Sequence, residues 1–165
     1  MALRWALAGA ALLAAAPMAG GAAPRAPDPE ASAARAANQA CLATRPAGSV
    51  CAGKAEQACV ARQQFSSSAT IEMCALRERD AWAALMPEAV AEAKSGLDDA
   101  RLSARLDSAQ AAWTHWRDGE LALTRALTAG GTIQDTAVAR RASELTEARI
   151  IDLQGGFLGV EPVEP

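Results

Sequence analysis

The chain of 165 residues has few of the residues that build β-sheets. It has no tyrosine and only two phenylalanines, and aromatic residues make up 4% of the sequence. No segment alternates apolar and polar residues over a useful length, so the pattern of a half-buried strand is also missing. The chain has no cluster of lysine and arginine residues either, which argues against a nucleic-acid partner. The composition therefore favours an all-α protein that does not bind nucleic acid.

The sequence also lacks the motifs of common enzymes. Nothing matches a nucleophile elbow, a phosphate-binding loop, a dinucleotide-binding fingerprint or a zinc-binding His-Glu-x-x-His. The single histidine, His115, lies between two tryptophans of an apolar helix stripe and is expected to face outward. A catalytic histidine would instead need a nucleophile and an orienting acid beside it. We predict no enzyme activity, no catalytic residue, no cofactor and no bound metal.

The one long apolar stretch, at the N-terminus, predicts a signal peptide over residues 1–22. Arg4 gives it a positive start, residues 5–16 are apolar, and residues 17–23 are small enough for a signal peptidase to cut. A retained membrane anchor is the weaker alternative, because a bilayer needs about 20 apolar residues. The first cysteine, Cys41, is far from the cut site, so there is no lipobox. We predict a periplasmic or secreted protein with no stable membrane anchor.

The mature chain is expected to be acidic and to form one domain. Removal of the signal peptide takes away one positive charge, Arg4, and moves the formal net charge from −3 to −4. Such a protein is steered toward cationic partners. We expect a flexible lead-in over residues 23–37, a helical domain over 38–156 and a loose tail over 157–165.

Four cysteines remain after processing, namely Cys41, Cys51, Cys59 and Cys74. An even number of cysteines in an exported chain favours disulfides, and three pairings are possible. We favour Cys41–Cys51 with Cys59–Cys74, because near neighbours close small loops, each contributing about 3 kcal/mol in the chain-entropy account. The alternative is a zinc site made by all four, but no Cys-x2-Cys spacing supports it.

The helical patterns predict an antiparallel helical bundle with a disulfide-stapled N-terminal part. Long helices are expected over residues 71–94, 98–128 and 134–154, with shorter helices over residues 30–44 and 54–64. Pro87 lies inside the first long helix. It is expected to kink that helix or to begin a new one, because proline lacks the N–H and clashes with the preceding turn.

The helix over residues 98–128 has the clearest periodicity in the chain. Its apolar residues recur at steps of four and three, which predicts a heptad-like seam that packs lengthwise on a partner helix. The pattern does not fix the oligomeric state, because the same helix could serve a dimer seam. The seam positions are Leu102, Leu106, Ala109, Trp113, Trp116, Glu120, Leu123 and Leu127.

Three tryptophans, Trp82, Trp113 and Trp116, fall on helical stripes and are expected to pack in the core. Trp116 is expected to be the most exposed of them. The alternative is that they anchor a partner protein, since tryptophan is common at binding hot spots.

Glu120 is a polar residue in an apolar seam and needs a partner if it is buried. Arg117 on the same helix, or Arg141 or Arg149 on the last helix, could supply one. We interpret Glu120 as one half of an ion pair that fixes how the last two helices align. The alternative is a polar contact surface for a ligand or partner.

Several motifs occur in a recognisable order. Cys74 is followed by Glu78 and Trp82, and a Gln-x-x-Trp-x-x-Trp-Arg-Asp-x-Glu string begins at Gln110; Gly-Gly-Thr and Leu-Thr-x-x-Arg follow. In this order and spacing, over residues 38–154, the chain resembles the LprI-like lysozyme-inhibitor family of bacterial exported proteins. The matching residues are Glu78, Trp82, Gln110, Trp113, Trp116, Arg117, Asp118, Glu120, Gly131, Thr146 and Arg149.

The chain also departs from the family's pattern. Ala83 stands where members usually have aspartate, and residues 87–90 replace an Asn-x-x-Tyr stretch. Leu121 and, approximately, Arg141 stand where many members have two further cysteines. The absence of both is expected if they form one bridge between the last two helices.

The resemblance implies inhibition of lysozyme in the cell envelope. Lysozymes of animal type are basic, so an acidic chain would be steered toward them, and they act through two carboxylates in a cleft. A loop could block that cleft, and the two candidates are residues 94–96 and residues 130–132, with Lys94 and Thr132 as contacts. Lys94 could pair with a cleft carboxylate. The alternative partner is another envelope protein, bound by a helical interaction module without lysozyme inhibition.

Overall fold

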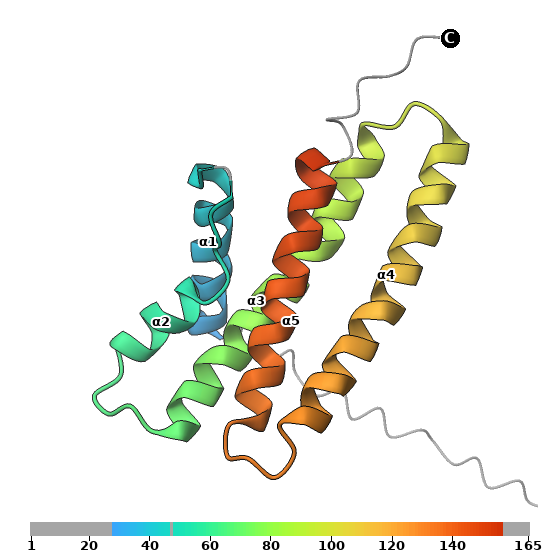
Figure 1. Ribbon diagram of the computed structural model, residues 1–165. Helices are drawn as coiled ribbons and strands as arrows, with labels where there is room; N and C mark the ends of the chain where they lie inside the picture. Colours follow the sequence, from blue (N-terminus) through green and yellow to red (C-terminus); the bar gives the residue numbers. More distant parts are fainter. Residues whose placement is uncertain (1–27, 47, 157–165) are drawn as a thin grey trace, which may run out of the picture.

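The computed structural model describes residues 28–46 and 48–156 of the chain. Within these ranges the protein is built from α-helices and a final π-helical turn, without a strand, which confirms the predicted all-α class (Figure 1). The expected signal peptide and the expected tail lie outside the described residues. In the part of the chain that is described, no helix combines the length and the apolar character that crossing a membrane requires.

The three long helices match the predicted ones closely. The first helix begins inside the expected lead-in, so residues 29–37 are helical, and the second ends before the expected residue 64. The elements are α1 (Pro29–Thr44), α2 (Lys54–Ala61), α3 (Ser68–Ser95), α4 (Ala100–Leu127), α5 (Gln134–Ile151) and the π-helical turn η1 (Asp152–Gly156).

Side-chain caps explain where three of these helices begin. The carboxylate of Asp28 accepts from the backbone N–H of Glu30 at the start of α1, and Asp99 accepts from that of Arg101 at the start of α4. Ser67 caps α3 in the same way. The helix α2 has no such cap, and its N-cap residue, Gly53, has φ 92°, a left-handed conformation that favours glycine. The first N–H groups of α2 must therefore be satisfied from elsewhere in the fold.

Pro87 does not begin a new helix, because α3 continues through it to Ser95. The ring of Pro87 lies on the exposed side of α3, whereas Leu85, Met86 and Ala89 on either side of it are buried. Burial of the same face before and after the proline keeps both halves docked on the bundle. That packing outweighs the hydrogen bond that proline removes.

The helices α3 and α5 form the centre of the bundle. They pack on each other along the most extensive interface of the fold, α1 and α2 cover α3 on one side, and α4 lies along α5 on the other (Figure 1). The largest core side chains are Trp82, Met86, Ile150 and Leu153, with Trp82 fully buried. This arrangement confirms the predicted antiparallel helical bundle.

The disulfides are those that the sequence favoured. Cys41–Cys51 joins the end of α1 to the segment before α2, and Cys59–Cys74 joins α2 to α3. The N-terminal part is therefore stapled to the bundle twice. All four cysteines are used in these bridges, so the zinc alternative is wrong.

Candidate functional site

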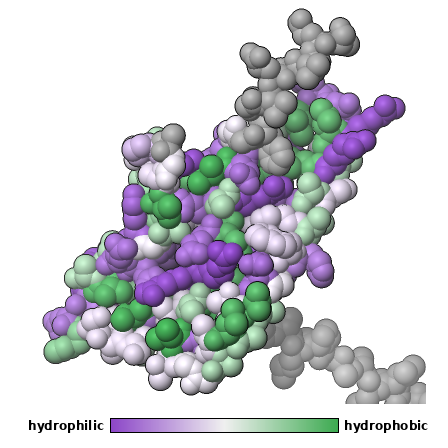
Figure 2. Space-filling model, viewed as in Figure 1, coloured by the Kyte–Doolittle hydropathy of each residue, from purple (hydrophilic) through white to green (hydrophobic). Residues whose placement is uncertain are grey.

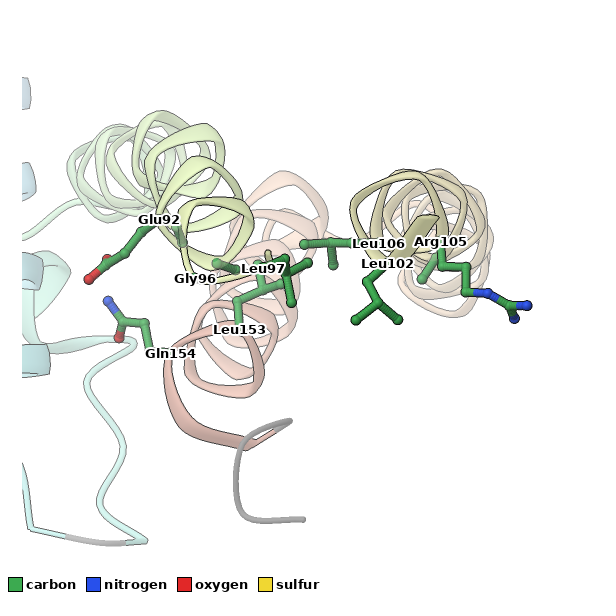
Figure 3. A pocket seen from close by; sticks show the side chains of 11 residues that line it. Glu92, Gly96, Leu97, Leu102, Arg105, Leu106, Leu153 and Gln154 are labelled. Carbon is green, nitrogen blue, oxygen red and sulfur yellow. The ribbon is translucent and has the colours of Figure 1, made fainter. Parts of the chain in front are cut away.

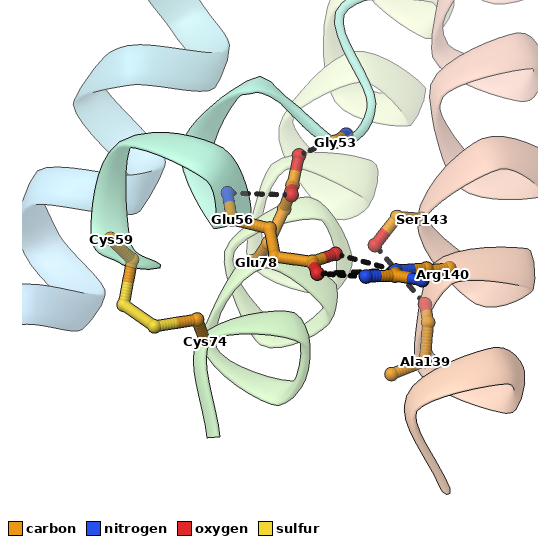
Figure 4. A network of polar contacts seen from close by, with 8 residues as sticks. All are labelled: Gly53, Glu56, Cys59, Cys74, Glu78, Ala139, Arg140 and Ser143. Carbon is orange, nitrogen blue, oxygen red and sulfur yellow. Dashed lines mark hydrogen bonds and ion pairs between the residues drawn. A yellow bond between two sulfur atoms is a disulfide. The ribbon is translucent and has the colours of Figure 1, made fainter. Parts of the chain in front are cut away.

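Two buried glutamates, one on α3 and one on α5, bind backbone N–H groups at the start of α2. The carboxylate of Glu78, on α3, accepts from the backbone N–H of Gly53 at 2.8 Å and of Glu56 at 2.9 Å (Figure 4). It also accepts from Nε1 of Trp82 at 3.3 Å. Glu78 is only 1% exposed. It therefore supplies, from another helix, the N-terminal cap that α2 lacks.

Glu147, on α5, completes this arrangement. Its two oxygens accept from the backbone N–H of Cys51 at 2.6 Å and of Ala52 at 2.8 Å. Two carboxylates thus accept hydrogen bonds from the N–H groups just before α2 and in its first turn, where the helix dipole favours negative charge. These contacts hold the start of α2 against α3 and tie the segment before it to α5.

A third buried carboxylate, that of Glu56, pairs with Arg140 on α5. The guanidinium donates from Nε and Nη2, and the shortest N–O distance is 2.6 Å (Figure 4). Ser143 lies beside the pair, but its hydroxyl donates to the backbone carbonyl of Ala139 at 3.2 Å. A polar cavity of about 220 Å³ opens next to these side chains.

The three carboxylates form a hydrogen-bonded network around α2. Each of the six oxygens of Glu56, Glu78 and Glu147 accepts a hydrogen bond from the protein. These hydrogen bonds hold α2, and the segment that leads into it, against α3 and α5. Within the described ranges, no group of acidic, histidine or cysteine side chains has the arrangement of a metal site.

Burial raises the pKa of Glu78 above its ordinary value of 4.5, because the loss of hydration outweighs the three hydrogen bonds that favour the charged form. The nearby charge of Glu56 raises the pKa further. As the pH rises, Glu78 loses its proton at a lower pH in the unfolded chain than in the folded chain. Folding therefore loses stability between pH 4.5 and the higher pKa of the folded protein.

We expect Glu78→Gln to remove this part of the pH dependence, because glutamine does not titrate. The wild-type protein should have a higher free energy of unfolding than the variant at every pH. The difference between the two free energies should become smaller as the pH rises from 4 toward 7. Urea unfolding of both proteins across this range measures the difference. An advantage that widens with pH would mean that hydrogen bonding, and not burial, dominates the pKa of Glu78.

Several polar contacts join α4 to α5, and two of them involve residues of the predicted motifs. The guanidinium of Arg141 donates to Glu120 at 3.0 Å, and Nε of Arg149 donates to the side-chain oxygen of Gln110 at 3.0 Å. Of the three arginines considered for Glu120, Arg141 is the partner. These contacts give Gln110, Glu120 and Arg149 a shared position at the interface between α4 and α5.

The residues between Gln110 and Glu120 lie closer to solvent. Arg117 stacks over the half-buried ring of Trp113, with its Cζ 5.2 Å from the ring centroid. It also pairs with Asp118, at 2.7 Å. Trp116 is 50% exposed, which confirms that it is the most exposed of the three tryptophans. His115 faces outward, as expected.

The predicted seam of α4 is only half used by the fold. Trp113 and Glu120 face the bundle and are partly buried, but no residue of α4 is fully buried. Leu102, Leu123 and Leu127 are 48%, 54% and 78% exposed. The expectation that the whole seam packs on a partner helix within the chain is therefore wrong, because α5 covers one edge of the stripe and leaves the other open.

An apolar groove of about 410 Å³ opens between the end of α3, the start of α4 and η1. Leu97, Leu102, Leu106 and Leu153 point toward one another across it, whereas Arg105 points away (Figure 3). The helix α4 packs more extensively on α5 than on α3, and the groove lies between α3 and α4. The space-filling view, from the same side as Figure 1, shows apolar residues interrupting the charged surface (Figure 2).

The two predicted partner contacts do not converge on one surface. Lys94 lies at the turn between α3 and α4, and Thr132 at the loop between α4 and α5, so the length of α4 separates them (Figure 1). A helix of 28 residues is about 42 Å long. Lys94 is also already paired with Asp107 at 2.6 Å. Gly131 and Thr132, in contrast, are exposed.

The remaining motif residues have structural positions. Thr146 is buried on α5, and Glu78 and Trp82 share the hydrogen bond described above. Sequence reasoning missed Glu147 and the pair between Glu56 and Arg140. Their partners are up to 96 residues away in the chain, and Glu147 occupies only an unspecified position of the Leu-Thr-x-x-Arg motif.

Comparison with known proteins gives one match. A family model described as lysozyme inhibitor LprI matches residues 59–153, from α2 to η1, which is more than half of the chain. No curated protein matches, and no solved structure matches. The matched range contains the Cys59–Cys74 bridge, the buried Glu78 and the whole of α3, α4 and α5.

Proposed function

The chain belongs to the LprI family of lysozyme inhibitors, and from that premise we propose that it is exported and inhibits a lysozyme by placing a loop in the catalytic cleft. The observation that carries the proposal is the family match over α2 to η1. The family model is described as a lysozyme inhibitor, which is the activity proposed here. The signal-like N-terminus supports export.

The loop between α4 and α5 has the better support as the inhibitory element. Gly130, Gly131 and Thr132 are exposed, and they are flanked by Leu127 and Ile133, which are 78% and 61% exposed. A narrow loop with apolar flanks can enter a cleft and bury those flanks, each worth about 1.5–3 kcal/mol if fully covered. Lys94 has less support, because it would have to leave Asp107 to reach a cleft carboxylate.

Charge would assist the encounter. The chain has a formal net charge of −3, and lysozymes of animal type are basic. Steering of this kind raises the association rate and weakens as salt screens the charges. Inhibition should therefore be stronger at low than at physiological ionic strength.

We expect Ile133→Asp to weaken inhibition of a c-type lysozyme by about 10- to 100-fold, because it removes one apolar anchor from the loop. The substitution should not harm the fold, since Ile133 is the N-cap residue of α5 and has no side-chain cap bond of its own, and aspartate is a good N-cap. Titration of the oxidised protein against lysozyme digesting cell walls measures the effect.

The matched control is Lys94→Ala, at the other end of α4, which should leave inhibition unchanged. If Lys94→Ala weakens inhibition and Ile133→Asp does not, the inhibitory contact is at the turn between α3 and α4. If the wild-type protein fails to inhibit at high excess, the second candidate stands, a helical module that binds another envelope protein.

A further inference from the structure

The exposed face of α4 carries two rows of residues that the monomer leaves uncovered. Within each row the spacing is seven residues, and the rows are offset by three, which is the a and d pattern of a coiled coil. All of these side chains are exposed. The first row is Leu102, Ala109, Trp116 and Leu123, and the second row is Arg105, Ala112, Gly119 and Ala126.

The side chains of the two rows differ in size, and that difference indicates which kind of helix can pack on them. The first row carries large apolar side chains, with Leu102, Trp116 and Leu123 each about half exposed. The second row is made of small residues except for Arg105, and a Cβ added at Gly119 would meet nothing within 4 Å. A helix that offers a large row beside a small row is complementary to itself when turned end for end.

We propose that α4 pairs with α4 of a second copy of the chain, in antiparallel orientation, to form a dimer. In an antiparallel pair the first row of one helix faces the second row of the other. With the two-fold axis at the level of Thr114, Leu102 faces Ala126 and Trp116 faces Ala112. Leu123 then faces the aliphatic stem of Arg105, and Ala109 faces Gly119. Each large side chain meets a small one or a flexible stem.

A parallel pair of α4 helices would pack much less well. Each row would face itself, so that Arg105 would meet Arg105 and Gly119 would meet Gly119, placing like charges together and leaving a void. In the antiparallel pair, Arg101 and Arg105 instead come to the C-terminal end of the other α4. The carbonyl groups there form the negative end of the helix dipole, which favours a cation.

The dimer also covers part of the apolar groove between α3 and α4. Leu102, Arg105 and Ala109 belong to the two rows and also line the groove between α3 and α4. The end of the second α4 therefore covers the open side of that groove, so one interface accounts for both apolar surfaces.

The oligomeric state tests the proposal directly. The oxidised wild-type protein should have the mass of two chains by light scattering or sedimentation at about 100 µM, a concentration at which even a micromolar Kd gives mainly dimer. Trp116→Glu should give the mass of one chain at the same concentration. Ala111→Glu, an exposed site on the opposite side of α4, is the matched control and should remain dimeric.

Cysteine pairs test the orientation. Chains with Ala109→Cys and chains with Gly119→Cys should form few cross-links alone but should cross-link when mixed, since these positions face each other only in the antiparallel pair. Cross-linking of Ala109→Cys with itself would show a parallel pair and would overturn the register. A wild-type protein that stays monomeric at about 100 µM would overturn the dimer itself. Neither experiment uses lysozyme, so failure here is separate from failure of the inhibitor function.

Discussion

Replacing Glu78 by alanine is expected to lower the free energy of unfolding by about 3–4 kcal/mol. The carboxylate is the acceptor for the backbone N–H groups of Gly53 and Glu56 and for the indole of Trp82. Its loss leaves buried donors without a partner, and each such donor costs about 1–3 kcal/mol, less any relief from water entering the cavity. Urea unfolding of the oxidised protein, followed by circular dichroism, measures the change.

Glu92→Ala is the matched control, because Glu92 lies on the same helix and is exposed. Glutamate and alanine have similar helix propensities, so the control should change stability by less than about 0.5 kcal/mol. Equal effects of the two substitutions would contradict the role given to Glu78 as the cap of α2.

Replacing Trp82 by alanine is expected to cost about 3–5 kcal/mol, because it empties a fully buried site in the core. The chain provides its own control in Trp116, which is the same residue type on another long helix but is 50% exposed. Trp116→Ala should cost less than about 1 kcal/mol. The unfolding of both variants should be measured at submicromolar protein concentration, so that self-association does not contribute to the measured stability.

A cost at Trp116 as large as that at Trp82 would mean that α4 is more deeply buried than the structure has it. A small loss of stability in Trp82→Ala would mean that neighbouring side chains between α3 and α5 repack into the space that the indole leaves. Trp82→Phe tests the hydrogen bond, because it keeps most of the apolar volume while it removes the N–H that donates to Glu78.

Much of the architecture follows from local patterns in the sequence. Apolar residues at steps of three and four predicted the long helices, and close spacing predicted the Cys41–Cys51 and Cys59–Cys74 bridges. The position of Glu120 in an apolar seam predicted an arginine partner on the same helix or on the last one, and the structure identifies it as Arg141 on the last helix. These features succeed because each depends on residues that are near in sequence or lie on one helix face.

The contacts around α2 could not be predicted in this way. Glu147 receives the N–H of Cys51 from 96 residues away, and Glu56 meets Arg140 across 84 residues. Both contacts depend on how whole helices pack, which no local pattern encodes. The same reason explains why no new helix begins at Pro87, where burial of α3 on both sides of the proline outweighs its local preference to end a helix.

The hydrogen bond from Cys51 to Glu147 has a consequence for oxidation of the chain. The sulfur of Cys51 is bridged to Cys41, while its backbone N–H is held by Glu147 of α5, which is 96 residues away in the chain. Docking of α5 and closure of the bridge favour each other, and by thermodynamic reciprocity each strengthens the other equally. The Cys41–Cys51 bridge is thus harder to reduce when the C-terminal helix is in place. Its resistance to thiols therefore depends on whether the chain has folded as far as its last helix.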